Sequence, residues 1–290
     1  MSNNNWKIQY LPFDEGMQEA LMQQHYAAQF LAKVGRHLIP QKADDSNTNM
    51  EFIPEENLLL GNALPNKIRL ALNLSDLKLI ILDNADSIKK TISLNGKTQR
   101  EVFVELSQDL ANLGVDVTNF KNELHYKIPF HPISKGAVFS IKNKNAFVEN
   151  SNFRNNAKIV LNEITQLFTQ EEPIRIWPHH FDTGAFFTVK KNEKGDPIQT
   201  IGIGFAIPDS MVAEPYYYLS FWSEKPIEGL DKFPPLANGK WMMPDWNGAV
   251  LKHSDLINAK SASEQHEIVK SFFNNGIEQL KEILKYVVKS

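Results

Sequence analysis

Short runs of alternating apolar and polar residues, joined by brief turns, constrain the fold of this chain more than any other feature. In KIRLALNL, residues 67–74, apolar side chains occupy every second position, and a second such run, SDLKLIILD, follows directly. Alternation predicts strands with one buried face, and the short turn between them predicts an antiparallel hairpin. The runs GAFFTVKK and QTIGIGFAI, separated by the turn NEKGDP, should pair antiparallel in the same way.

Helical periodicity is present in four other segments of the chain. Apolar residues recur every three or four positions in residues 14–38, 98–113, 153–168 and 261–287. Residues suited to cap a first turn begin three of these segments, namely Asp14, Thr98 and Ser261. On the last helix Phe272 lies on the apolar stripe, so we expect its side chain to be buried.

Helices packed on antiparallel strands predict the α+β class. Each half of the chain has the order helix, strands, helix, which suggests two similar α+β halves. We expect an N-terminal half over residues 1–128 and a C-terminal half over residues 153–290, joined by an irregular connection over 129–152 that is rich in Pro, Asn and Lys.

Composition excludes several classes of protein. The chain has 290 residues, 42% of them hydrophobic, which is enough for one large domain or two small ones. The 31 basic and 34 acidic residues give a net charge of −3, so the basic stripe that a nucleic-acid binder needs is not expected. No apolar run approaches the ~20 residues that cross a bilayer, and no secretory signal is recognisable. We therefore expect a cytoplasmic protein without nucleic-acid or membrane partners.

The absence of cysteine removes disulfides, thiolate metal sites and a thiol nucleophile. Walker, HExxH and GxSxG motifs are also absent, and we expect no cofactor. The GxG in IGIGFA opens no helix, so it predicts a strand rather than a dinucleotide site. Its residues Gly202, Gly204 and Ala206 give one strand face little bulk, so either a neighbouring aromatic side chain or a ligand should lie close to that face.

The strongest candidate site is WPHHFD, residues 177–182. If this segment is a strand, His180 and Asp182 share one face, and His179 lies on the other. The pair His180–Asp182 would have one of three roles. It would serve acid–base catalysis, bind a metal, or form a buried structural pair in which each side chain is the hydrogen-bond partner of the other. Replacement of His180 by alanine should then cost more stability than replacement of His179.

A metal at this position needs ligands from elsewhere in the chain. Glu214 and His253 are the available side chains, and the conditional ligand set is His180, Asp182 and Glu214. We expect no tightly bound metal, because the local spacing supplies only two convergent groups.

The order of WPHHFDTGAFF, then IGIGFAIPDSMVAEPYYYLSFW, then WNGAVL resembles the bacterial domain-of-unknown-function family 5996. The resemblance is most specific in the second half of the chain and extends more weakly into the first. It implies no reaction. It implies that a set of residues belongs together, namely Trp177, His179, His180, Asp182, Glu214, Tyr216, Trp246 and Gly248. The chain departs from the family pattern at LKHSDL, where a proline and a tyrosine are expected.

Two functional hypotheses follow. Aromatic residues are dense in the second half, as expected for either a small-molecule pocket or a large core. The first hypothesis is a small-molecule-binding or scaffold protein with an aromatic-lined site around the WPHHFD strand, in which Trp177, His179, Glu214, Tyr216 and Trp246 bind the ligand. The alternative is a hydrolytic or acid–base enzyme that uses His180 and Asp182 as catalytic residues, with or without a metal. The oligomeric state is left open.

Overall fold

A computed structural model describes residues 5–170, 172–227 and 233–285. The chain forms two compact units. Unit 1 comprises Met1–Phe13, Phe153–Ile174 and Asp182–Ser290, and unit 2 comprises Asp14–Asn152 and Arg175–Phe181. This division differs from the expected halves, because the first 13 residues group with the C-terminal half and residues 175–181 group with the N-terminal half.

Unit 2 is an antiparallel sheet with the strand order β6-β1-β2-β3-β4-β5. Its strands are β1 (Met50–Ile53), β2 (Leu58–Gly61), β3 (Arg69–Asn73), β4 (Lys78–Leu82), β5 (Ile88–Ser93) and β6 (Arg175–Trp177). The predicted β3–β4 hairpin is confirmed, with Ala71 opposite Ile80. Strands β1 and β2, with the short helix η1 (Pro54–Glu56) between them, were not predicted, because so short a pair has too few positions to show alternation.

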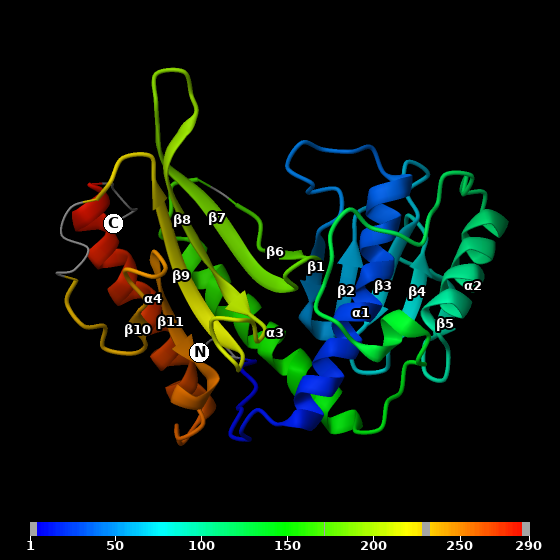
Figure 1. The fold of residues 1–290 in the computed structure, drawn as a ribbon, viewed down its shortest axis with the longest axis horizontal. Helices are drawn as coiled ribbons and strands as arrows, with labels where there is room; N and C mark the ends of the chain where they lie inside the picture. The colour runs from blue at the N-terminus through cyan, green and yellow to red at the C-terminus, as the bar shows by residue number, and fades with distance from the viewer. Residues whose placement is uncertain (1–4, 171, 228–232, 286–290) are drawn as a thin grey trace. The chain divides into compact units, whose positions relative to one another are not determined.

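Helix α1 (Glu15–Leu38) lies against β2 and β3 in unit 2 (Figure 1). Asp14 caps it as predicted, because its side chain accepts a hydrogen bond from the Met17 N–H. Helix α2 (Gln99–Asn112) packs on β5 and begins with the predicted capping box between Thr98 and Glu101. A short helix, η2 (Pro132–Lys135), follows in the irregular segment.

Unit 1 is an antiparallel sheet with the strand order β10-β11-β9-β8-β7. Its strands are β7 (Asp182–Lys191), β8 (Pro197–Ala206), β9 (Tyr216–Ser223), β10 (Lys240–Trp241) and β11 (Gly248–Lys252). The predicted antiparallel pairing of GAFFTVKK with QTIGIGFAI is confirmed, and Figure 1 shows the long β7–β8 hairpin that it forms. The short helix η4 (His253–Asp255) and then α4 (Ala262–Leu284) follow β11.

One face of the unit 1 sheet carries helices. On β8 Phe205 stacks on Phe153 of α3 (Lys144–Thr165), with ring centroids 5.5 Å apart. Tyr217 on β9, the register partner of Phe205, meets Phe273 of α4 at 6.2 Å. Because strand side chains alternate, the neighbouring residues on β7, β8 and β9 point to the opposite side, which we call the open face.

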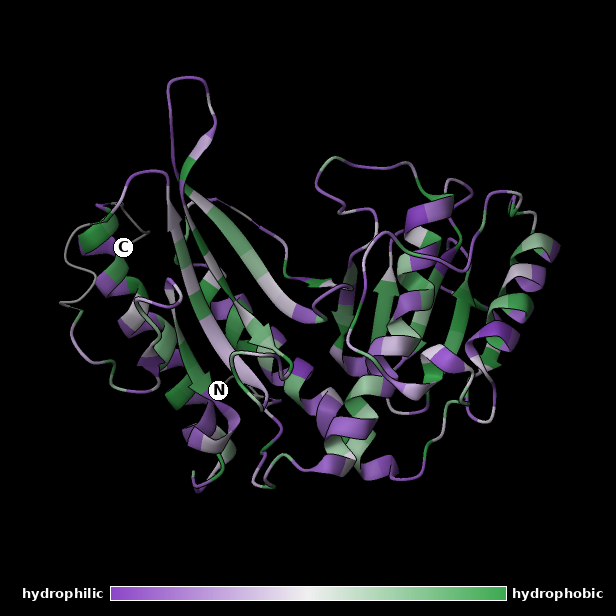
Figure 2. Ribbon diagram, in the orientation of Figure 1, coloured by the Kyte–Doolittle hydropathy of each residue, from purple (hydrophilic) through white to green (hydrophobic). Residues whose placement is uncertain are grey.

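Hydropathy follows this arrangement. Figure 2 shows hydrophobic residues concentrated along β2, β3 and β4 and hydrophilic residues in the connecting loops and at the tip of the β7–β8 hairpin. Both observations fit sheets with buried faces and solvated connections. Four α-helices and antiparallel strands in the described residues confirm the α+β class.

Two sequence expectations were wrong. Helix α3 begins at Lys144 rather than near residue 153, so the last part of the expected irregular connection is helical. Strand β6 ends at Trp177, and residues 178–181 form a turn before β7 begins at Asp182. The expected strand through WPHHFD is therefore interrupted at Pro178, which cannot donate a ladder hydrogen bond.

Phe272 tests the packing of α4. Its side chain is fully buried, as predicted, and its ring lies 5.1 Å from that of Phe273. We expect Phe272→Ala to lower the free energy of unfolding by about 3–5 kcal/mol, because it leaves a cavity in the core. Urea denaturation measures this loss, with the exposed Phe130→Ala as the matched control. A loss below about 1 kcal/mol would show that α4 does not pack as described.

Candidate functional site

The WPHHF segment of unit 2 is a tight turn. The Phe181 N–H donates to the Trp177 carbonyl at 2.6 Å, and Phe181 adopts a φ of 56°. This is the left-handed region, uncommon for a bulky residue, so the surroundings must hold it there. Strand alternation does not apply within such a turn. It therefore no longer supports a shared face for His180 and Asp182, and that pairing stays a prediction.

Helix α1 holds the turn in place. The Pro178 carbonyl accepts hydrogen bonds from His25 Nε2 at 2.8 Å and Gln29 Nε2 at 3.0 Å. The fully buried His25 ring stacks on that of Phe181, with centroids 4.8 Å apart and planes 2° apart. A carbonyl only accepts, so the His25 proton lies on Nε2. These contacts explain how Phe181 keeps its unusual backbone conformation.

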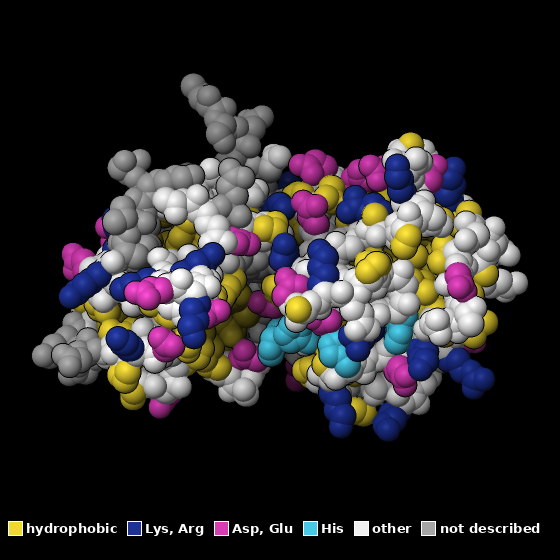
Figure 3. Space-filling view, turned by 90° about the horizontal axis from the view of Figure 1, so that it is seen from above, with side chains coloured by type: hydrophobic (Ala, Val, Ile, Leu, Met, Phe, Trp, Pro, Cys, Tyr) yellow, Lys and Arg dark blue, Asp and Glu magenta, His cyan; other side chains and the backbone are white. Residues whose placement is uncertain are grey.

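The two histidines of the motif have different surroundings. His179 is half-buried, and its ring lies 6.3 Å from Trp177, 5.7 Å from Tyr126 and 4.4 Å from His180. His180 is exposed. Histidine side chains come to the surface together on the face drawn in Figure 3. Trp177, His179 and His180 thus form one ring cluster, in which His179 is the central member.

Asp182 belongs to unit 1, where it begins β7. Its Oδ2 accepts from the Tyr218 hydroxyl at 2.8 Å, while the neighbouring Thr183 hydroxyl accepts from Arg154 at 2.7 Å. Burial raises the pKa of Tyr218 far above its ordinary value, and the Asp182 charge raises it further. Burial lowers the pKa of Arg154 to about 9, opposed by Asp182, so the guanidinium stays charged at neutral pH. A buried cation and a carboxylate held in this way are characteristic of a structural network.

The remaining predicted residues of unit 1 separate into two places. Tyr216 and Trp246 pack in one apolar cluster on the open face, and the Tyr216 hydroxyl donates to Asp209 at 2.7 Å. Glu214 lies elsewhere. Its two oxygens accept from the backbone N–H and the hydroxyl of Ser254, at 2.7 and 2.9 Å. Glu214 therefore fixes the start of η4, and its role in binding a ligand stays a prediction.

His253, the other side chain considered for a metal, is buried. Its Nε2 donates to the Leu11 carbonyl at 2.7 Å, and its ring meets Phe153 edge-on at 4.9 Å. Across the residues that the structure describes, no three histidine or acidic side chains converge to hold a metal ion.

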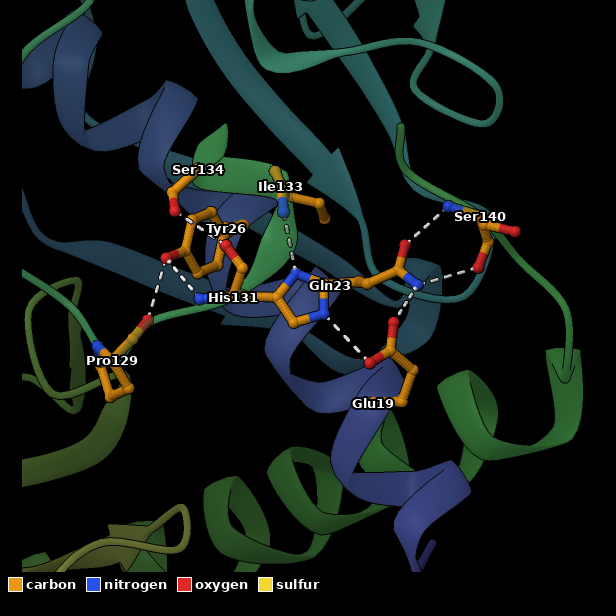
Figure 4. Close-up of polar contacts among 8 residues, drawn as sticks. All are labelled: Glu19, Gln23, Tyr26, Pro129, His131, Ile133, Ser134 and Ser140. Atoms are coloured by element: carbon orange, nitrogen blue, oxygen red, sulfur yellow. Dashed lines mark hydrogen bonds and ion pairs between the residues drawn. The ribbon is translucent and has the colours of Figure 1, made fainter. Parts of the chain in front are cut away.

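Sequence analysis missed a histidine–carboxylate pair in unit 2, shown in Figure 4. His131 donates from Nε2 to Glu19 Oε2 at 3.0 Å, and its Nδ1 accepts from the Ile133 N–H at 3.4 Å. Burial alone would raise the pKa of Glu19, but hydrogen bonds from His131 and Gln23 outweigh it and lower that pKa. The residues are 112 positions apart, so no local spacing could reveal the pair.

This pair is part of a set of contacts that ties the irregular segment to α1 (Figure 4). Gln23 donates to the Ser140 carbonyl at 3.0 Å and accepts from the Ser140 N–H at 2.7 Å. The Tyr26 hydroxyl donates to the Pro129 carbonyl at 2.9 Å and accepts from the His131 N–H at 3.1 Å. These polar atoms have protein partners, so the cluster functions as a structural clamp.

The open face of unit 1 carries a groove with a volume of about 420 Å³. Two of its lining residues, Phe186 on β7 and Ser220 on β9, belong to one row of register partners across the sheet, in which Gly202 on β8 lies between them and Gly248 on β11 follows Ser220. The middle of this row has almost no side-chain bulk. The depression therefore coincides with the small residues Gly202 and Ser220, which the strand register places side by side.

Aromatic rings form the walls of the groove. Phe186 and Trp222 are 59% and 48% exposed, and both line the same groove, so they form one exposed apolar patch rather than isolated residues. The Trp246 ring lies directly over Gly248, where a methyl group would overlap it. Polar residues complete the lining, namely Thr200, Ser220, Asp245 and Asn247. The arrangement combines aromatic surfaces with a few polar groups, as small-molecule sites do.

The strand face of IGIGFA that carries the glycines was expected to lie against either an aromatic side chain or a ligand, and the two glycines differ in this respect. A methyl group on Gly204 would overlap the Tyr218 ring, so at this position a neighbouring aromatic side chain explains the glycine. Gly202 instead lies beside Ser220 and Phe186, and both of these residues line the groove. The alternative of a ligand therefore applies only there.

Comparisons with protein-family models, with curated proteins and with solved structures find no match to the chain. No helix in the described residues is long and apolar enough to cross a membrane.

Lys33 on α1 is a buried cation that sequence analysis missed. Its Nζ donates to Asn122 at 2.7 Å and lies 4.9 Å from the Phe30 ring centroid. Burial lowers the pKa of Lys33 from 10.5 to about 8. The charged lysine is therefore less stable in the folded protein than in the unfolded chain.

This shift predicts a pH dependence of stability. Between about pH 8 and 10.5 the unfolded chain binds more protons than the folded protein, so stability should rise with pH, by at most about 3 kcal/mol. Urea denaturation across this range should show the rise in the native protein relative to Lys33→Met, which removes the charge. Parallel pH profiles for the two proteins would contradict the assignment.

The two motif histidines give a second prediction, opposite to the expectation from the sequence. His179→Ala should destabilise the protein more than His180→Ala, by about 1 kcal/mol. The reason is that the His179 ring contacts Trp177 and Tyr126, whereas the exposed His180 has fewer ring contacts to lose. Thermal unfolding of both variants measures the difference. A larger effect at His180 would instead restore the case for a pair with Asp182.

Proposed function

We propose that the protein binds a small organic molecule in the groove on the open face of unit 1. The observation that carries this proposal is the exposure of Phe186 and Trp222 in a groove that Ser220 lines between them, next to Gly202 in the strand register. Apolar rings left in water at a hollow lose the free energy that burial would provide, about 25 cal/mol per Å². A ligand that covers them recovers it.

The proposal keeps the aromatic-lined site expected from the sequence and shifts its position. Trp246 is common to the expected site and the groove, and Phe186 follows Asp182 on the same strand. The proposed position is further along β7 than the WPHHFD motif. In the alternative, an acid–base enzyme would use His180 and Asp182. That hypothesis relied on strand alternation to place His180 and Asp182 on one face, and residues 178–181 form a turn instead. We therefore favour ligand binding over catalysis.

The proposed partner is a small molecule rather than a nucleic acid, because the net charge is −3 and no lysine or arginine lines the groove among the residues that the structure describes. A cytoplasmic location and membership of the bacterial family 5996 are kept as proposals. The first is supported by the absence of cysteine, and the second only by the WPHHFD, EPYYY and WNGAVL segments.

Ligand-observed NMR tests this function with a fixed set of probes: indole, benzyl alcohol, methyl glucoside and choline. We expect saturation transfer to at least one probe, and we expect Phe186→Ala and Trp222→Ala each to weaken its binding by about fivefold, roughly 1 kcal/mol. The matched control is Phe130→Ala, which also removes an exposed phenylalanine but lies in unit 2. The proposal fails if no probe shows a signal that depends on both groove residues.

A further inference from the structure

We infer that the groove of unit 1 selects a cation of the alkylammonium class, such as a trimethylammonium group. This inference rests on the proposed function, since it names the ligand class of the same site. It depends on three features of the groove: the placement of the aromatic rings, the charge of the lining, and the width of the floor.

Three aromatic side chains, Phe186, Trp222 and Trp246, line the groove. Phe186 leans over Gly202, with its Cδ2 3.8 Å from the position that a methyl group on this glycine would occupy. At the other end Trp246 lies over Gly248, and Trp222 follows Ser220 by two residues on the same face of β9. The face of an aromatic ring is the negative end of its quadrupole, and tryptophan attracts cations most strongly.

The charge in the lining has one sign. Asp245 is the only charged residue that lines the groove within the described chain. No described side chain forms an ion pair or a hydrogen bond with its carboxylate. The carboxylate and the ring faces therefore attract the same charge, and an anionic ligand would meet repulsion from all of them.

The spacing of the strands suits a compact group. Neighbouring strands lie about 4.8 Å apart, so Gly202 on β8 and Gly248 on β11 are separated by roughly 10 Å, with Ser220 between them. Phe186 and Trp246 lean on the two glycines and occupy part of this width. A compact methylated ammonium group suits the space that remains beside Ser220.

A neutral sugar is the strongest competing ligand, because aromatic rings with Asp, Asn, Ser and Thr also suit hydroxyl groups. The unpaired Asp245 favours the cation, since a sugar gives it hydrogen bonds but no compensating charge. Methyl glucoside, one of the probes above, tests this alternative directly.

The experiment compares choline with 3,3-dimethyl-1-butanol, its uncharged isostere, by calorimetric titration of the full-length protein at constant ionic strength. We expect choline to bind at least about tenfold more tightly, equivalent to 1.4 kcal/mol. Both probes have the same shape, so the difference isolates the contribution of charge.

Two variants assign that difference to residues. Asp245→Asn should weaken choline binding by about threefold to tenfold and leave the isostere unchanged, whereas Trp222→Leu, which also removes apolar surface, should weaken choline by about threefold more than the isostere. The matched control is Asp86→Asn, which neutralises an exposed aspartate of unit 2 at a φ of 56°, a backbone conformation that asparagine tolerates.

The outcomes separate this inference from the proposed function. Equal or tighter binding of the isostere overturns the cation preference and leaves a small-molecule site. If neither probe binds at about 50 mM, which corresponds to less than roughly 2 kcal/mol of binding free energy, the inference is overturned. Indole, benzyl alcohol and methyl glucoside then decide whether the groove binds small molecules.

Discussion

The antiparallel register of β7, β8, β9 and β11 is the constraint on which the account depends. It aligns Phe186, Gly202, Ser220 and Gly248 in a single row on the open face. A shift by one residue on any of these strands would exchange its two faces and move the small residues toward the helices. The apolar alternation of Ile201, Ile203 and Phe205 prevents such a shift, because their burial against α3 and α4 would be lost.

The same register explains why one end of the open face is filled and the other is hollow. At the filled end, Ala206, Tyr216 and Val250 form a small apolar core, with Tyr218 and Trp246 packed against it. Tyr218 fills the space above Gly204, and its hydroxyl donates to Asp182. Over Gly202 the nearest described side-chain atom is the Ser220 hydroxyl, which is much smaller than a tyrosine ring, so the groove begins where that core ends.

Most of the fold could be predicted from the sequence, because its signals are local. Alternation predicted β3, β4, β7 and β8, and capping residues predicted the starts of α1, α2 and α4. The start of α3 was missed because KNAFVENS is polar and rich in asparagine, which is a weak helix former. The turn at WPHHF was missed because its cause is distant, namely His25 and Gln29 on α1.

The candidate site was harder to predict for the same reason. Trp246 and Gly202 were both singled out, yet only the pairing of β8, β9 and β11 brings their surroundings together. Phe186 was not singled out from the sequence, and Trp222 was counted only among the dense aromatic residues of the second half. Glu214 was expected to bind a ligand, but its oxygens accept from Ser254, 40 residues later. Spacing along the chain carries no information about such contacts.

The position of the ligand is the central claim, and the tryptophans report on it directly. The five tryptophans include Trp222 and Trp246 in the groove and Trp177 in the WPHHF turn. The measurement is fluorine NMR of the protein labelled with 5-fluorotryptophan, with resonances assigned by single Trp→Phe variants, during titration with choline. The account predicts that the Trp222 and Trp246 resonances shift while that of Trp177 stays in place. A shift of Trp177 without the groove tryptophans would contradict it and place the binding site at the histidine turn.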